Sequence, residues 1–343
     1  MSDDGHAVLA LFDRRTIAQI VLGFGIAGLV LLLLVDFVGT KDVLDRLADT
    51  DLGWLALGCL STLLCLTAWG KAWQIVLGVA GVEESFRRLV VTYYAATFAN
   101  YVTPLGQAGG EPFIAYVLSR DTEASYEDAL ASVVTADLLN LLPFVTFSGV
   151  GFAALLYQAQ LPAVLEPFAA ALFGVALGLP ILAAVGWRFR FRLGRLLIRL
   201  AAPVVRRAPR LSVDSLRGRL RELNEAFQRI AKDPSALVRA VAFSYVGWIF
   251  FALPLYFSGL AVSDATIPLL LVFFIVPAST LAGMVPSPGG SGAVEAALVV
   301  LIVALTPIAD DGATAISILY RVASYFFALG IGGLAAVYVI RRN

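Results

Sequence analysis

The 343-residue sequence is poor in the residue types that carry enzyme chemistry, with one histidine, His6, and two cysteines, Cys59 and Cys65. A serine or cysteine nucleophile needs a base, and the single histidine lies in a polar N-terminal tail. Two thiols in one apolar run, without further ligands, indicate packing residues rather than a zinc site. The sequence also has no phosphate-binding loop, dinucleotide fingerprint or metal motif. We therefore expect no cofactor, no metal and no enzymatic activity.

Charged residues are scarce as well. They form 15% of the chain, while hydrophobic residues form 59%; soluble globular proteins contain about 25% charged residues. This composition excludes a water-soluble enzyme and predicts an all-α polytopic membrane protein, with a single membrane domain over residues 1–343. The formal net charge is zero, 25 basic against 25 acidic residues, but the charges are unevenly distributed along the chain.

Six apolar runs are long enough to cross a bilayer, which takes about 20 residues. They are residues 17–38, 52–80, 128–157, 163–187, 235–258 and 312–340. The first run follows Arg14 and Arg15, as a signal anchor does, but it is too long for a signal-peptide core and no small-residue cleavage site follows it. We therefore expect it to remain in the protein as one of six full transmembrane helices.

Two further apolar regions are interrupted by proline and glycine. Residues 89–103 would form a helix of about 22 Å, short of the hydrocarbon core of about 30 Å, and a shorter apolar arm, 108–119, follows the break. Residues 265–285 meet the run Pro-Ser-Pro-Gly-Gly and then a short arm, 293–306. Both regions indicate re-entrant broken hairpins, because irregular backbone at membrane depth needs surrounding protein or a water-filled cavity.

The basic residues fall on one side of the membrane if each hairpin returns to its own side. That side holds Arg14, Arg15, Arg87, Arg88, Arg120, the segment 188–232, Arg341 and Arg342. The opposite loops are acidic, with Asp42, Asp45, Asp49, Asp51, Asp310 and Asp311. The positive-inside rule therefore places both termini in the cytoplasm, in a multi-pass protein of the cell membrane.

The two interrupted regions align with each other, without a gap, at one constant shift along the chain. The matches are Pro104 with Pro288, Gly106 with Gly290, Glu111 with Glu295, and Asp137 with Arg321. We interpret residues 89–157 and 265–340 as the cores of two repeats of opposite orientation. In transporters built from inverted repeats, broken segments at corresponding positions mark the substrate site.

Glu111 and Glu295 each lie at the start of the second arm of a hairpin. A helix start at mid-depth offers free N–H groups and the positive end of a dipole, which suits an anion such as a lipid phosphate; Ser291 is a candidate cap for its arm. The two glutamates either line a polar cavity and meet a cationic headgroup, a proton or a buried arginine, or merely stabilise the helix starts. Intramembrane ionisable residues are functional by default.

Asp137 and Arg321 lie deep in their helices, where an isolated charge costs several kcal/mol. Their equivalent positions and opposite signs predict that they pair across the repeat axis. The pair is either a structural ion pair or a gate that contacts the substrate. Neighbouring polar residues, among them Asn100, Asn140 and Tyr325, are more typical of helix–helix hydrogen bonds.

Residues 188–234 form a basic linker between two spans. The part 188–232 carries 12 arginines and one lysine against three acids, a net charge of +10. Beyond Ser212, a second helix carries leucine, phenylalanine and isoleucine on one face. We expect this amphipathic cytoplasmic linker to lie on the membrane, with the basic residues from Arg188 to Lys232 contacting anionic lipid headgroups. We expect no nucleic-acid binding, because basic residues routinely flank membrane spans.

The stretch 100–111 (NYVTPLGQAGGE) and the stretch 285–295 (VPSPGGSGAVE), followed by Leu319-Tyr320-Arg321, resemble the flippase-like transmembrane family, the membrane domain of lysylphosphatidylglycerol synthase/flippase proteins. The resemblance covers nearly the whole chain and implies a multi-pass fold with two re-entrant helices, often dimeric, that moves lipids between leaflets. Membrane lipids are therefore the expected substrate and a second copy of the chain is an expected partner. The expected substrate-binding residues are Glu111, Pro288, Gly289, Gly290, Glu295 and Arg321, to which the repeat adds Asp137.

The chain departs from the family in the helix after the first hairpin, where many relatives carry a Glu-Arg pair and then an acid. Here those positions are Ala136, Asp137 and Asn140, which changes the charge network. No soluble aminoacyl-transfer domain follows the membrane region, so we do not expect this chain alone to synthesise a lipid.

The leading hypothesis is a flippase or scramblase for polar or glycosylated lipids, with a polar groove between the two hairpins. A secondary transporter of a small polar solute shares the inverted repeat and differs by a closed, lipid-free site. A membrane-embedded glycosyltransferase is the third hypothesis, because Asp49-Thr50-Asp51 resembles a metal-binding D-x-D motif. A loop that starts the next helix accounts for the same three residues.

Overall fold

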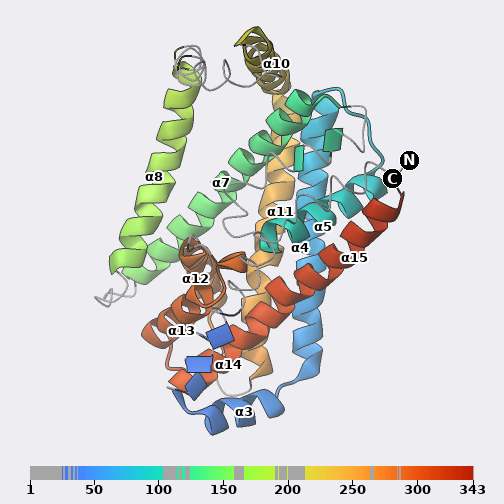
Figure 1. Cartoon of the computed structure of the whole chain (residues 1–343). Coiled ribbons are helices and arrows are strands. Elements are labelled where there is room, and N and C mark those ends of the chain that lie inside the picture. The colour runs from blue at the N-terminus through green and yellow to red at the C-terminus, as the bar shows by residue number, and fades with distance from the viewer. Residues whose placement is uncertain are drawn as a thin grey trace.

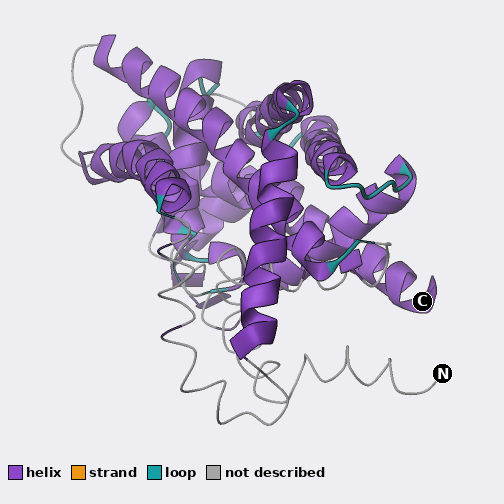
Figure 2. Ribbon diagram, turned by 90° about the horizontal axis from the view of Figure 1, so that it is seen from above, coloured by secondary structure: helices purple, strands orange, loops and turns teal. Residues whose placement is uncertain are grey.

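Helices form every regular element in the part of the chain that the structure describes. The computed structural model describes residues 38–102, 124–157, 166–189, 213–262, 266–283 and 287–342, together with isolated positions elsewhere. Figure 2 shows these helices in purple, with short described loops in teal between some of them. The elements are α3 (Thr40–Ala48), α4 (Leu52–Val79), α5 (Phe86–Val102), α7 (Tyr126–Tyr157), α8 (Glu166–Arg188), α10 (Val213–Ala231), α11 (Pro234–Ala261), α12 (Leu269–Ala282), the 3₁₀ turn η2 (Pro288–Gly290), α13 (Ala293–Leu305), α14 (Asp310–Arg321), the π-helical turn η3 (Val322–Phe326) and α15 (Phe327–Arg342).

Within the described residues, five helical segments are long and apolar enough to cross a membrane. They are Leu52–Val79, Tyr126–Ala153, Pro234–Ala261, Pro288–Leu305 and Asp310–Val339. Large apolar side chains also lie on the molecular surface, with Leu52 71% and Leu334 75% exposed. A surface of this kind suits lipid rather than water, so the expected multi-pass membrane protein is confirmed.

Helices α4 and α11 form a long antiparallel pair in the middle of the molecule (Figure 1). The first residues of α4 meet the last of α11, where the Asp51 N–H donates to the Ala261 carbonyl at 3.1 Å. The helices approach closely because Gly247 faces the indole of Trp69, which would lie 2.3 Å from an added Cβ. We call this end of the molecule the α3 end, and the opposite end, where α4 finishes and α11 begins, the α10 end (Figure 1).

Two crossings flank this central pair. Helix α5 packs along α15, and α12 packs along α7. Each crossing depends on a glycine: an added Cβ on Gly332 of α15 would lie 2.6 Å from the Tyr94 carbonyl oxygen, and one on Gly151 of α7 would lie 2.5 Å from Phe274 of α12. Backbone therefore approaches backbone at both crossings, as is typical of small residues between membrane helices.

The second interrupted region folds into two short helices packed against each other, α12 and α13. They have 14 and 13 residues, or about 21 and 20 Å, less than the hydrocarbon thickness of about 30 Å. The apolar segment Pro288–Leu305 reaches a spanning length only because it includes the turn η2, in which Gly289 is not helical. Their connection, 283–292, contains the Pro-Gly-Gly turn η2. The predicted Pro/Gly break and the short second arm 293–306 are therefore present as η2 and α13, whereas the first arm, expected to be long enough to cross, is the 14-residue helix α12.

Several other predictions concern residues that lie outside the described part of the chain. The run 17–38, the second arm 108–119 and the first part of the basic linker lie almost wholly outside the described residues. The amphipathic helix of the linker is present as α10, and Ile230 on its apolar face is buried. Two elements were not anticipated, the surface helix α3 and the π-helical turn η3.

Candidate functional site

The turn between α12 and α13 is built from glycines that no other residue replaces without strain. Gly289 and Gly290 have φ angles of 56° and 65°, in the left-handed region that favours glycine. An added Cβ on Gly289 would lie 2.0 Å from the Tyr325 ring, and one on Gly290 would lie 2.4 Å from the Cα of Gly283. The turn is therefore held between α12 on one side and the π-helical turn η3 on the other.

Glu295, the third residue of α13, is buried at 4% exposure. Its Oε2 accepts a hydrogen bond from the Gly292 N–H at 2.6 Å, which stabilises the start of the helix. The Ser317 hydroxyl of α14 donates to the Glu295 carbonyl oxygen at 3.2 Å. The glutamate therefore stabilises a helix start, and its other carboxylate oxygen has a separate partner.

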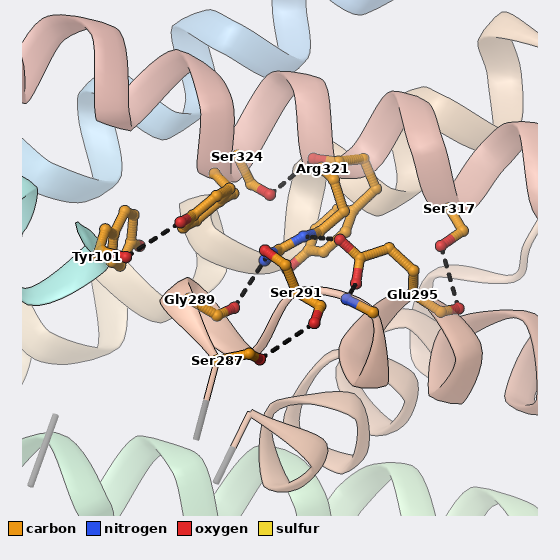
Figure 3. A network of polar contacts seen from close by, with 11 residues as sticks. Tyr101, Ser287, Gly289, Ser291, Glu295, Ser317, Arg321 and Ser324 are labelled. Carbon is orange, nitrogen blue, oxygen red and sulfur yellow. Dashed lines mark hydrogen bonds and ion pairs between the residues drawn. The ribbon is translucent and has the colours of Figure 1, made fainter. Parts of the chain in front are cut away.

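That partner is Arg321, the last residue of α14, which points into the turn (Figure 3). Its Nε donates to Glu295 Oε1 at 2.7 Å, and its Nη2 donates to the Gly289 carbonyl oxygen at 3.0 Å and to the Ser291 hydroxyl at 2.9 Å. One guanidinium thus holds the turn, its serine and the start of α13 together. Arginine suits this place because it keeps its charge and offers five donors in a fixed plane.

The Glu295–Arg321 ion pair is buried, since the arginine is 7% exposed. A buried pair gains little net stability over apolar residues of the same size, because both charges lose their hydration. Removal of one partner alone costs about 3–5 kcal/mol, because the other charge is then stranded. The network therefore makes the turn conformation depend on both charges at once.

Two tyrosines extend this network toward α5. The guanidinium carbon of Arg321 lies 4.1 Å from the ring centroid of Tyr325, a cation–π geometry. The Tyr325 hydroxyl donates to the Tyr101 carbonyl oxygen at 3.0 Å, and the two rings lie 5.0 Å apart. Tyr325 lies in the π-helical turn that follows Arg321, and such turns often occur at functional sites.

The structure brings five of the seven predicted site residues together: Pro288, Gly289, Gly290, Glu295 and Arg321. Glu111 lies outside the described residues. Asp137 lies in α7, within electrostatic range of Tyr93 on α5. That any of these seven residues binds a substrate stays a prediction.

Two details of the predicted site are wrong. Arg321 takes Glu295 of its own half as its ionic partner and not Asp137, because the turn places the glutamate within hydrogen-bonding distance. The cap residue of α13 is Gly292 and not Ser291, whose hydroxyl instead accepts from Arg321. The sequence did not indicate Tyr101 as part of the site. Its carbonyl oxygen accepts a hydrogen bond from Tyr325, and a backbone contact of this kind leaves no signal in the sequence.

A polar pocket of about 620 Å³ lies at the α10 end, away from the Arg321 network. Its lining combines both signs of charge with aliphatic side chains: Lys71, Gln74, Ile75, Gly78, Val79, Val82, Glu83, Glu84, Ser85, Asp233 and Arg239. The Lys71 ammonium donates to Gln74 at 2.6 Å. Among the residues that the structure describes, no group of three or more His, Cys, Asp or Glu side chains could hold a metal ion.

Comparison with known proteins agrees with this architecture. The family described as "Lysylphosphatidylglycerol synthase TM region" matches residues 20–332. The chain belongs to this family. It is 26% identical over 338 residues to a UPF0104 membrane protein of Methanothermobacter thermautotrophicus, covering 95% of this chain and 94% of the relative. It is 23% identical over 310 residues to a UPF0104 membrane protein of Pyrococcus horikoshii, covering 88% and 92% of the two chains.

Proposed function

We propose that this protein moves polar or glycosylated lipids between the leaflets of the cell membrane, as a flippase or scramblase and not as an enzyme. The observation that carries the proposal is the buried Glu295–Arg321 pair, which holds a glycine turn in the interior of an otherwise apolar helical protein. Charges at such depth are costly and mark substrate pathways. The family description, which names the membrane region of a lipid synthase, supports a lipid substrate.

We infer that the fold consists of two inverted repeats. Corresponding helices begin at residues 52 and 234 (α4 and α11), 86 and 269 (α5 and α12), and 126 and 310 (α7 and α14). The step in residue number is almost the same for the three pairs. Because α4 and α11 run in opposite directions, the two copies have opposite orientations, as in many transporters.

The packing supports the same inference, because each half pairs its short helix with the long helix of the other half. Helix α5 of the first half packs along α15 of the second, and α12 of the second half packs along α7 of the first. In this arrangement α12 and α13 form a re-entrant hairpin, entered and left at the α3 end. The Pro-Gly-Gly turn then lies at mid-depth, where irregular backbone needs the protein around it.

The pocket at the α10 end suits the headgroup of such a lipid. Lys71 and Arg239 attract a phosphate, Glu83 attracts an ammonium group, and Ile75 and Val79 contact the apolar part. The positive-inside rule places this end in the cytoplasm together with both termini. We propose that a headgroup enters here and passes the turn held by Arg321.

Reconstitution into liposomes with fluorescent lipids of anionic, zwitterionic and glycosylated headgroups tests the proposal. We expect the wild-type protein to accelerate lipid movement and Glu295→Gln to reduce the rate at least about tenfold, since a loss of about 1.4 kcal/mol is tenfold. Glu225→Gln on the exposed side of α10 is the matched control and should retain the rate.

If the wild-type protein moves none of these lipids faster than empty vesicles, the proposed function is wrong. Thermal stabilisation by a small polar solute, without any effect of lipids, would favour a secondary transporter instead.

A further inference from the structure

Two ion pairs join the proposed halves at opposite ends of the molecule. At the α3 end, Arg46 Nε contacts Asp311 Oδ2 at 2.9 Å. At the α10 end, Arg229 Nη2 contacts Asp128 Oδ1. Each arginine lies in the last turn of its helix, α3 or α10, and each aspartate lies in the first turn of its helix, α14 or α7. Each pair links helices that belong to different halves, α3 to α14 and α10 to α7.

The two pairs have similar places in the proposed repeat. Asp128 is the third residue of α7 and Asp311 is the second residue of α14, so the two aspartates differ by one position when the starts of these helices are matched. The caps of the helices that follow the two arginines also correspond. Asp51 caps α4 by accepting from the Gly53 N–H, and Asp233, at the matching position before α11, accepts from the Ala236 N–H. The surface helices α3 and α10 are therefore counterparts, which extends the repeat beyond the interrupted segments.

We propose that Arg46–Asp311 and Arg229–Asp128 are two clamps at opposite ends that open in turn, so that each controls access to the central site from its own end. The inference rests on the proposed lipid movement through a site between the halves. If one half rocks against the other around a fixed site, contacts between halves must break at one end while they hold at the other. In this structure both ion pairs are formed.

The chemistry of the clamps suits repeated opening. Both arginine side chains are partly exposed, 38% for Arg46 and 46% for Arg229, so each pair is weak and shifts a two-state equilibrium by only about two- to fivefold. Both aspartates lie at helix N-termini, where the helix dipole stabilises a carboxylate without its partner. Asp128 also accepts from the Ser125 hydroxyl at 2.9 Å. An opened clamp therefore leaves no stranded buried charge, unlike the Glu295–Arg321 pair.

The test compares local opening at the two ends of the full-length protein in nanodiscs of phosphatidylglycerol and phosphatidylethanolamine. Hydrogen–deuterium exchange is measured for Arg46→Glu, for Arg229→Glu, and for the charge swaps that add Asp311→Arg or Asp128→Arg. We expect Arg46→Glu to raise exchange about two- to fivefold at the start of α14 alone, and Arg229→Glu to do so at the start of α7 alone. Each charge swap should restore the wild-type pattern and the wild-type rate of lipid movement.

The control is Asp310→Asn, which removes an exposed charge beside Asp311 in the same helical turn and should change neither readout. In a protein that moves lipid, clamp variants that leave the rate unchanged, or that raise exchange equally at both ends, overturn the proposal. If the wild-type protein moves no lipid, the proposed function fails. In that case the hydrogen-exchange pattern tests the clamps on its own. Faster exchange confined to the mutated end supports the clamps, and exchange that stays unchanged at that end overturns them.

Discussion

The long helices that follow the two interrupted segments carry opposite charges at equivalent positions, Arg321 at the end of α14 and Asp137 in α7. In the second half, Arg321 is neutralised by Glu295 of the same half and bonds the glycine turn directly. In the first half, the equivalent residue is a carboxylate within electrostatic range of the Tyr93 hydroxyl on α5. In the proposed repeat, matching positions therefore have different chemistry in the two copies.

The two halves of the proposed repeat are therefore not interchangeable. The second half holds its turn with the Glu295–Arg321 ion pair, whereas the first half has an aspartate at the position that matches Arg321. Contact between Asp137 and the substrate stays a prediction.

The largest effect is expected for Arg321→Met. The substitution leaves the Glu295 carboxylate buried without its cation, which costs about 3–5 kcal/mol of unfolding free energy. Thermal unfolding in detergent measures the loss. The double variant with Glu295→Met should recover most of the stability, because a buried pair replaced by apolar residues is often neutral, while lipid movement stays lost. A single variant as stable as the wild type would show that the pair does not hold the turn.

Gly289→Ala tests the turn itself and should cost about 1–3 kcal/mol, because alanine is strained at a φ of 56° and its Cβ would overlap the Tyr325 ring. Gly330→Ala in α15 is the matched control. No atom lies within 4 Å of its added Cβ, so stability should not fall there. Equal losses in the same unfolding measurement for the two variants would contradict the specific role of the turn.

Asp137→Asn should change the free energy of unfolding by about 1 kcal/mol or less, because asparagine keeps the size and the hydrogen-bonding capacity of the side chain. Lipid movement should nevertheless fall at least about tenfold if the carboxylate meets the substrate. Unfolding and reconstituted transport are measured on the same preparation. A variant with full transport would assign Asp137 a structural role only.

The smallest effect is expected at the N-terminal cap of α11, which Asp233 provides. Hydrogen bonds from the Ala236 N–H and the Ser235 hydroxyl lower the pKa of Asp233 below its ordinary value of 3.8. Its cap therefore stabilises the start of α11 fully above that ordinary value, and the contribution is lost as the pH falls through the lowered pKa. Hydrogen exchange of residues 234–238 should increase over that acidic range. Asp233→Asn should remove this pH dependence, and an unchanged profile would exclude the cap as its cause.

The long helices were predictable from the sequence because hydropathy over about 20 residues or more is a property of the segment alone. The expected spans 52–80 and 235–258 agree with α4 and α11 to within a few residues. The Pro/Gly break before α13 was predictable for a similar reason, since proline and glycine act locally. Helix α3 was missed because its short sequence carries mixed charges between two spans and resembles a loop.

The partner of Arg321 could not be derived in the same way. Two acids, Glu295 and Asp137, were both reasonable, and the choice depends on the path of the turn in space rather than on spacing. The π-helical turn that places Tyr325 over the guanidinium arises from packing and has no sequence signature. The two clamps were also not predicted from the sequence. The positions of Arg46 and Arg229 do not reveal their ionic partners, Asp311 and Asp128, which lie far away along the chain.

Photo-crosslinking tests the central claim most directly, that a lipid headgroup passes between the two halves beside the Arg321 network. A zwitterionic phospholipid with a photoreactive headgroup is activated in proteoliposomes, and the modified residues are mapped by mass spectrometry. We expect labelling of residues 287–292 and of the pocket residues 82–85. Excess unlabelled lipid should reduce the labelling, and the Glu295→Gln variant should lose it at residues 287–292. Labelling confined to outward-facing residues such as Leu269 and Leu334, and unchanged in that variant, would contradict it.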